Sequence, residues 1–323
     1  HWLGKQGRLT HPMVLRPGAS NYTPISWDEA FGIIAEELSA LSSPDRAVFY
    51  TSGRTSNEAA FAYQLFVRSF GTNNLPDCSN LCHEATGTAL SAAIGMGKGS
   101  VRLSDFEEAD VIVVVGQNPG TNHPRMLSTL ESAKRRGARI IAVNPLPEAG
   151  LLRFRNPQRV NGMAGRGQAL ADLHLPIRLG ADAALFQLWS RAVLDAGAVD
   201  QLFVEEHTHG FDAFAEHVRG LDTHELLAIT GIDRDLVRRA TELVVGARRL
   251  IVCWAMGITQ HVGATDTIRE IVNLALLGGH IGRPGAGLCP VRGHSNVQGD
   301  RTMGIWEKPP AAFSDRLDAH FGI

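Results

Sequence analysis

The chain has 323 residues, of which 44% are hydrophobic and 20% are charged. These fractions are ordinary for a globular protein, and the length predicts about two domains. A net charge of −2 predicts no broad attraction to nucleic acid or to an anionic membrane. No apolar run approaches the roughly 20 residues of a membrane span, and no charged-then-apolar leader is visible. We therefore expect a cytoplasmic protein with no nucleic-acid partner and no membrane span.

Strands and helices alternate along the chain. In chain order, we expect a strand at 47–51, a helix at 56–70, a strand at 110–115, a helix at 123–136, a strand at 138–143, helices at 181–196 and 233–245, a strand at 249–254 and a helix at 265–277. The β-branched run at 110–115 is typical of a central parallel strand. With 123–136 and 138–143 it predicts a βαβ unit. Residues 282–304 carry six glycines, and we expect a long irregular loop there, which is usually functional.

The number of cysteines argues against a disulfide scaffold. The four cysteines are Cys78, Cys82, Cys253 and Cys289, too few for a chain of this length. Cys253 lies in an apolar run and Cys289 lies in a Gly-rich loop before a proline, so we expect both to be structural thiols.

Cys82 and His83 are the most informative pair in the sequence. We expect them at a helix start, with Asn80 as the candidate cap, where the helix dipole favours the thiolate that binds a soft metal or acts as a nucleophile. A half-buried thiol beside a solvated histidine is the alternative. With Cys78 the pair also resembles half of a zinc site, but few further Cys and His pairs at zinc spacing complete it.

Two further segments suggest ligand binding. The Gly116–Gly120 loop follows a predicted parallel strand, where ligands bind in open α/β sheets and where backbone NH groups suit a phosphate. It lacks the Gly-x-Gly-x-x-Gly pattern of NAD sites, and an ordinary strand–helix turn is the alternative. Asp182, after Gly180, could cap a helix or accept hydrogen bonds from a guanine base. Arg292 lies among Gly, His, Ser and Asn and suits a small carboxylate or oxyanion, unless it is a surface arginine.

Several motifs occur together in one order along the chain. They lie at residues 25–30, 52–58, 71–74, 116–119, 123–124, 254–261, 282–287 and 290–299. Through them the chain resembles the molybdopterin oxidoreductases of the formate dehydrogenase and nitrate reductase type over nearly its whole length. The likeness is closest to formate dehydrogenase alpha subunits.

The resemblance implies an α/β fold with layered helices around mostly parallel sheets, in Rossmann-like units. It implies that residues 1–20 are the remnant of a junction to an N-terminal cluster domain. Residues 21–77 and 295–323 would then form part of an α/β domain, and residues 78–294 would form a Rossmann-like cofactor-binding domain.

The resemblance also implies a molybdenum (or tungsten) ion held by two molybdopterin guanine dinucleotides. Cys82 falls at the family's metal-ligand position, and His83 and Arg292 fall at active-site positions of formate dehydrogenases. The implied cofactor-binding residues are Arg54, Asn57, Gly116, Gln117, Asn118, Pro119, Asn144, Pro145, Gly180, Asp182, Met256 and Gln260. A [4Fe–4S] iron–sulfur cluster is expected in the full-length protein, with ligands that lie before His1.

The implied reaction is the two-electron oxidation of formate or a similar small anionic substrate. Arg292 would hold the anion, His83 would accept a proton, and electrons would pass to an acceptor protein or subunit that the sequence does not identify. Glu84 stands where formate dehydrogenases typically have glycine, which adds charge and bulk beside the metal. The alternatives are a nitrate-reductase-type oxyanion reductase, a cofactor-binding relative without turnover, and a nucleotide-binding α/β enzyme with a nucleophilic cysteine.

Overall fold

The computed structural model describes residues 1–323, apart from the side chain of Asn161. The chain forms two compact units, which are described separately. Unit 1 contains His1–Cys78 and Asn296–Ile323, and unit 2 contains Ser79–Ser295. Among the described residues, we find no helix with both the length and the apolar character that crossing a bilayer requires.

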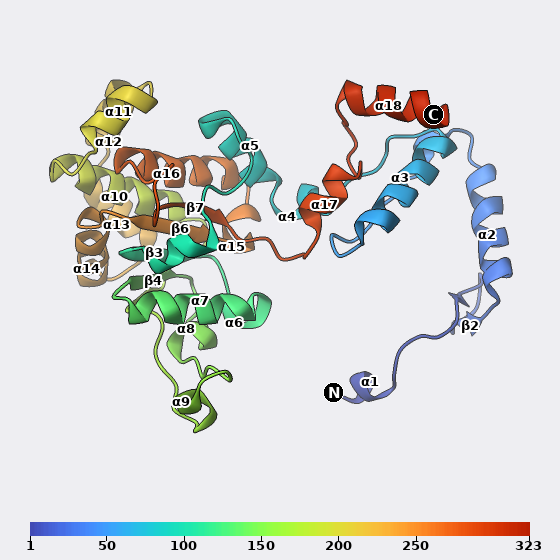
Figure 1. The fold of residues 1–323 in the computed structure, drawn as a ribbon, viewed down its shortest axis with the longest axis horizontal. Helices are drawn as coiled ribbons and strands as arrows, with labels where there is room; N and C mark the ends of the chain where they lie inside the picture. Colours follow the sequence, from blue (N-terminus) through green and yellow to red (C-terminus); the bar gives the residue numbers. More distant parts are fainter. The chain divides into compact units, whose positions relative to one another are not determined.

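Unit 2 is built on a five-stranded sheet whose strands are all parallel (Figure 1). The strands are β3 Val111–Val115, β4 Arg139–Val143, β5 Leu173–Leu175, β6 Leu250–Trp254 and β7 Gly287–Pro290, in the spatial order β5-β4-β3-β6-β7. Chain order runs outward from β3 to β5 on one side and then resumes at β6 on the other. The switch point, where ligands bind in such sheets, therefore lies at the carboxyl ends of β3 and β6.

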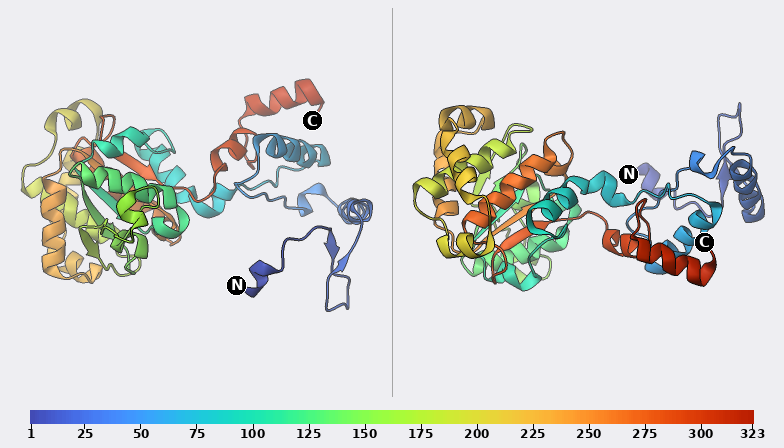
Figure 2. Two further views of the ribbon diagram at one scale, coloured as in Figure 1. Left: turned by 60° about the horizontal axis from the view of Figure 1, so that its bottom comes forward. Right: turned by 90° about the horizontal axis from the view of Figure 1, so that it is seen from above.

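Helices cover both faces of this sheet (Figures 1 and 2). The helices of unit 2 are α5 Glu84–Ile94, η2 Leu103–Glu107, α6 Pro119–Asn122, α7 Pro124–Arg135, α8 Ala149–Leu152, α9 Val160–Met163, α10 Asp182–Asp195, α11 Gln201–His207, α12 Phe211–Gly220, α13 Thr223–Thr230, α14 Arg234–Val245, α15 Met256–Thr259 and α16 Ala264–Leu277. The short helix α4 Cys78–Cys82 begins at the unit boundary. The predicted α/β fold with helices around a parallel sheet is confirmed.

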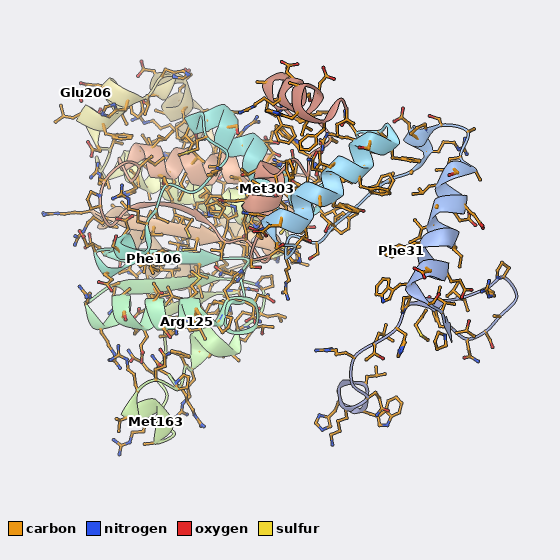
Figure 3. All side chains as sticks on the ribbon, turned by 45° about the vertical axis from the view of Figure 1, so that its right-hand side comes forward. Phe31, Phe106, Arg125, Met163, Glu206 and Met303 are labelled. Atoms are coloured by element: carbon orange, nitrogen blue, oxygen red, sulfur yellow. The ribbon has the colours of Figure 1, made fainter. Side chains whose placement is uncertain are left out.

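The central strand β3 shows why its sequence is apolar throughout. Val111, Val113 and Val115 lie in one core together with residues of α10 and α16, and Ile112 and Val114 lie in a second core with residues of α7 and with Phe106 (Figure 3). Every residue of β3 is buried. A strand that is covered on both faces needs apolar side chains at successive positions, not at alternate ones.

Unit 1 consists mainly of helices. They are α1 Trp2–Lys5, α2 Trp27–Ser39, η1 Pro44–Arg46, α3 Asn57–Phe70, α17 Val297–Thr302 and α18 Ala311–Phe321, with an antiparallel pair of strands, β1 Met13–Val14 and β2 Thr23–Pro24. Helix α3 begins at the predicted cap, where Ser56 Oγ accepts from the Ala59 N–H at 3.3 Å, and it ends at Gly71. The unit has its own small core around Phe49, Leu75 and Ile305, against which Met303 packs (Figure 3).

The helices predicted at 56–70, 123–136, 181–196, 233–245 and 265–277 and the strands β3, β4 and β6 are confirmed, but the expectations for residues 47–51 and 282–304 are wrong. Residues 47–51 are extended but do not form a strand, because only isolated hydrogen bonds connect them to Asn74. The Phe49 N–H donates to the Asn74 carbonyl at 2.9 Å, and the Asn74 side chain donates to Ala47 O at 3.1 Å. Residues 282–304 are not irregular throughout, since they contain β7 and α17. The glycine and proline of β7 weaken the strand pattern in its sequence. A proline is tolerated there because β7 lies at the edge of the sheet.

Candidate functional site

Cys82 lies just before a break between two helices. It is the last residue of α4, and His83, with φ −139° and ψ 25°, separates α4 from α5. The expectation that one helix starts near Asn80 and continues through Cys82 is therefore wrong, because the backbone leaves the helical region at His83. Cys82 itself is buried, at 6% exposure.

Side chains from the segment after β6 hold the backbone of Cys82. Thr259 Oγ1 donates to the Cys82 carbonyl at 2.6 Å, and Gln260 Nε2 donates to the same carbonyl at 3.2 Å and to Leu81 O at 3.0 Å. The last carbonyls of a helix have no partner within the helix, so these donors satisfy them. Gln260, a predicted cofactor residue, thus positions the predicted metal ligand, and Thr259 was not predicted.

His83 is buried, at 1% exposure, and its ring is held on one side. Its Nδ1 lies 3.1 Å from Thr86 Oγ1, which also accepts a hydrogen bond from Trp254 Nε1–H at 3.0 Å. His83 Nε2 is buried and makes no hydrogen bond of standard geometry, although the Val291 carbonyl lies close enough to raise its pKa. Burial first, and then the charge of Arg292, lower the pKa of His83 to about 4, so the imidazole is neutral near pH 7.

Arg292 is tied to the same region and to the loop after β3. Its Nη1 donates to Ser79 Oγ on α4 at 3.3 Å. Its carbonyl lies 2.9 Å from His123 Nε2, whose Nδ1 in turn lies 3.3 Å from Gln117 Nε2. Because the carbonyl can only accept, His123 Nε2 carries a proton, and its neutral form accepts from Gln117. The fold thus brings Arg292 to His83 and α4.

At the switch point, the backbones of two glycines, Gly116 and Gly257, lie in direct contact. Gly116 has φ +54°, and a Cβ on it would come within 2.9 Å of the Gly257 backbone. The Gly257 N–H donates to Gly116 O at 3.0 Å. The predicted residue Gln117 follows and is buried, and its Oε1 has no hydrogen-bond partner. The two glycines therefore let α15 approach closely at the carboxyl edge of the sheet, where ligands bind in such folds.

One unpredicted carboxylate organises the loops after β3 and β4. Glu148 accepts hydrogen bonds from the side chains of Asn118 and Asn144, the latter at 3.4 Å. Asn118 also caps α6 through Oδ1, which accepts from the Thr121 N–H at 3.1 Å, and Pro119 is the first residue of that helix. No sequence motif marks Glu148, whose role is visible only when the two loops are adjacent.

The remaining predicted residues lie in four places. Pro145 is exposed after β4, and Met256 is exposed at the start of α15. Gly180 and Asp182 precede and begin α10, where Ala181 and not Asp182 occupies the cap position. Burial raises the pKa of Asp182 to about 6. Arg54 and Asn57 belong to unit 1, where Arg54 is exposed and Asn57 Oδ1 accepts from Asn296 Nδ2 at 2.9 Å.

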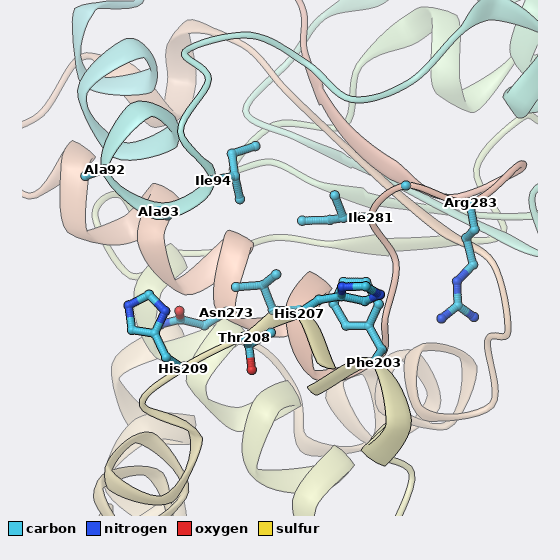
Figure 4. A pocket seen from close by; sticks show the side chains of 12 residues that line it. Ala92, Ala93, Ile94, Phe203, His207, Thr208, His209, Asn273, Ile281 and Arg283 are labelled. Atoms are coloured by element: carbon cyan, nitrogen blue, oxygen red, sulfur yellow. The ribbon is translucent and has the colours of Figure 1, made fainter. Parts of the chain in front are cut away.

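Two other features do not coincide with the predicted site. Within the described residues, no three His, Cys, Asp or Glu side chains gather as a metal site. A cavity of about 740 Å³ lies beside α5, α11 and α16 (Figure 4). His207, His209, Asn273 and Arg283 contribute its polar side chains, and Arg283 pairs with Asp200. None of the predicted site residues lines this cavity.

Comparison with known proteins identifies the relatives of this chain. The family model described as molybdopterin oxidoreductase matches residues 8–305. An uncharacterized oxidoreductase of Mycobacterium tuberculosis is 60% identical, over 100% of this chain and 42% of the relative. Protein YdeP of Escherichia coli is 46% identical, over 100% of this chain and 44% of the relative. Formate dehydrogenase H of Escherichia coli is 32% identical, over 92% of this chain and 40% of the relative.

The chain therefore spans less than half the length of these curated relatives. Among solved structures, acetylene hydratase from Pelobacter acetylenicus superposes with a TM-score of 0.70 at 20% identity. That match covers 98% of this chain and 41% of the other chain. At this identity the likeness concerns the fold alone.

Proposed function

The chain belongs to the molybdopterin oxidoreductase family, and we propose that its full-length protein oxidises formate or a similar small anion at a Cys82-ligated molybdenum centre. We further propose that the pterin cofactor takes the bis(guanine dinucleotide) form and that the full-length protein also carries an iron–sulfur cluster. The observation that supports the proposal best is the convergence of Cys82, His83 and Arg292. Cys82 and His83 are buried, and the partly exposed Arg292 lies near enough to act on His83 by its charge and donates to Ser79 of the same helix as Cys82.

The residues present fit a large polar cofactor. A buried cysteine offers a soft sulfur donor, and its backbone is already fixed by Thr259 and Gln260. The Gly116–Gly257 contact lies at the switch point, where ligands bind in such sheets. Gln117 Oε1 is a buried polar atom without a hydrogen-bond partner, and such an atom is costly unless a ligand or water satisfies it. We infer that the cofactor supplies this partner.

When bound, the molybdenum–pterin group supplies the two-electron redox chemistry, which belongs to the cofactor and not to the side chains. Arg292 would bind the anionic substrate through its guanidinium, which stays charged and can form two parallel hydrogen bonds to a carboxylate. His83 would meet the substrate as a neutral imidazole. With a pKa of about 4, it can take up a proton only transiently and must release it quickly, so a proton relay suits it better than proton storage.

Glu84 bears on the choice of substrate. It is exposed and is the first residue of α5, where its carboxylate is favourable because the helix N-terminus is positive. A second negative charge near the site disfavours anionic substrates through repulsion. This repulsion acts on formate and nitrate alike, so both substrates are tested.

The test uses the full-length protein, purified and assayed for molybdenum, guanine nucleotide and iron. We expect oxidation of formate with an artificial electron acceptor, and we expect Cys82→Ala to lose both activity and one sulfur neighbour of the metal in X-ray absorption. Cys78→Ala, one turn earlier on the same short helix, is the matched control and should keep the sulfur coordination. Reduction of nitrate without formate oxidation would contradict the proposed substrate. Unchanged sulfur coordination in Cys82→Ala would contradict the proposed ligand.

A further inference from the structure

Cys253 and Cys289 lie side by side on neighbouring parallel strands. Strand β6 pairs with β7 in a register that makes Cys253 and Cys289 direct partners. Adjacent strands in a sheet lie about 4.8 Å apart, within the roughly 4.4–6.8 Å that the Cα atoms of a disulfide span. The backbone of the sheet therefore already places both residues at a separation that a disulfide permits.

Both thiols also lie on the same face of the sheet. Cys253 belongs to the core that contains Ile251 and residues of α7, and Cys289 packs against that core. Their neighbours Val252 and Leu288 lie in the core on the opposite face. Since side chains alternate along a strand, two residues that are in register and on one face direct their sulfur atoms to the same space.

We propose that Cys253 and Cys289 are a peroxide-oxidisable dithiol pair that closes reversibly into a disulfide between β6 and β7. The two members differ in access, because Cys253 is fully buried whereas Cys289 is partly exposed. A small hydroperoxide can therefore reach Cys289 first, and Cys253 is the resolving thiol beneath it. This pair is separate from Cys82 and requires no cofactor.

The electrostatics agree with that order of attack. A hydrogen bond from Cys253 lowers the pKa of Cys289, whereas burial raises the pKa of Cys253. The thiolate is the nucleophile in thiol oxidation. The Cys289 thiolate attacks hydrogen peroxide, breaking its O–O bond to give Cys289 sulfenic acid and hydroxide. The Cys253 sulfur then attacks the sulfenic sulfur and water leaves, so two electrons pass from the two sulfurs to the peroxide.

The disulfide would lie next to the segment that carries Arg292. Val291 N–H donates to Trp254 O at 2.8 Å, so the contact between the two chain segments continues beyond the two cysteines. Oxidation therefore fixes β7 to β6 just before that segment begins.

The test is to treat the full-length protein with hydrogen peroxide, unfold it, alkylate the remaining thiols and digest it with trypsin. Cleavage after Arg249, Arg269 and Arg292 places the two cysteines on separate peptides, 250–269 and 270–292. We expect these peptides to appear joined, lacking two hydrogens, and to separate after treatment with dithiothreitol. The joined species should be lost in Cys289→Ser and in Cys253→Ala, and it should persist in the control Cys78→Ser.

Three results would overturn the proposal. One is full alkylation of both cysteines after peroxide treatment. Another is accumulation of Cys289 sulfinic acid while Cys253 remains a thiol. The third is attachment of either peptide to Cys78, to Cys82 or to a second chain. Since mass spectrometry of the wild-type protein gives each result, the test does not depend on whether Cys253→Ala folds.

Discussion

At the scale of single residues, Thr86 shows how a side chain without acid–base chemistry can orient one that has it. Its hydroxyl lies between Trp254 Nε1 and His83 Nδ1, and all three residues are buried. If Thr86 donates its hydroxyl proton to Nδ1 while accepting from Trp254, then His83 carries its own proton on Nε2. That nitrogen is buried, and it lies near the Val291 carbonyl without a hydrogen bond of standard geometry.

Replacing Thr86 by Val tests this orientation. The change keeps the shape of the side chain but leaves two buried ring nitrogens without partners, and we expect it to lower the unfolding free energy by about 2 kcal/mol. Thr86→Ser keeps the hydroxyl and is the matched control. Urea unfolding gives the two free energies, and nitrogen NMR of the His83 ring gives its tautomer. If Val and Ser variants are equally stable and share one tautomer, Thr86 does not orient His83.

Replacing Arg292 by Lys tests the proposed anion site. Lysine keeps the charge but cannot form the two parallel hydrogen bonds of a guanidinium. We expect KM for formate to rise by about tenfold or more, a loss on the order of 1.4 kcal/mol in binding, with a smaller change in kcat. Steady-state kinetics of the full-length protein gives both values. Arg238→Lys, on the exposed face of α14, is the control, and an unchanged KM in Arg292→Lys would remove Arg292 from the substrate site.

At the scale of elements, the strands that could be predicted are those covered by helices on both faces of the sheet. Strands β3, β4 and β6 are long apolar runs because they lie at or near the centre of the sheet. Strands β5, with the sequence Leu-His-Leu, and β7, with Gly-Leu-Cys-Pro, are short edge strands. Their own residues carry too weak a pattern, and it is pairing with β4 and β6 that makes them strands.

The interruption of the helix at His83 has a similar origin. The Cys82 carbonyl accepts from Thr259 and Gln260, which come from a distant part of the sequence. Local propensity favours continuing the helix from Asn80 into α5, since the good helix formers Glu84, Ala85, Ala89 and Leu90 follow. Contacts that form only in the folded chain therefore decide the backbone at the predicted metal ligand, and a pattern read along the sequence does not contain them.

Gly116 offers a test of the switch point as an element. We expect Gly116→Ala to lower the unfolding free energy by at least about 2 kcal/mol, because the new Cβ meets the Gly257 backbone at 2.9 Å and φ is +54°. Gly197 has φ +64° and nothing within 4 Å of its added Cβ, so Gly197→Ala measures the conformational cost alone. Equal losses in the two variants would show that β3 and α15 do not meet closely.

At the scale of the whole molecule, the resemblance to a family predicts where the chemistry lies, and the fold shows how the predicted residues are held. Cys82, His83 and Arg292 were predicted from motifs, and unit 2 brings them together. Ser79, Thr86, Thr259 and Glu148 were not predicted, because each acts through contacts between segments far apart in the sequence. Arg54 and Asn57 belong to unit 1, and their role in binding cofactor remains a prediction.

The pH dependence of stability tests whether the buried Asp182 carboxylate lacks hydrogen-bond donors in the chain without cofactor. Asp182 is 5% exposed, and burial raises its pKa from 3.8 to about 6. The native state therefore holds this proton more tightly than the unfolded state between about pH 4 and pH 6, so stability falls as pH rises through that range. A shift of about two units corresponds to roughly 2 to 3 kcal/mol lost above pH 6. A ligand that donates hydrogen bonds to Asp182 would offset this cost.

We expect Asp182→Asn to remove that loss in the chain without cofactor. Relative to wild type, the variant should gain stability progressively from pH 5 to pH 7.5, as measured by urea unfolding at each pH. Asp212, exposed in the first turn of α12, is the matched control, and Asp212→Asn should keep a constant difference from wild type. A constant difference for Asp182→Asn as well would mean that its carboxylate is already satisfied without a ligand. In that case a guanine base would have no unmet acceptor to bind at the start of α10.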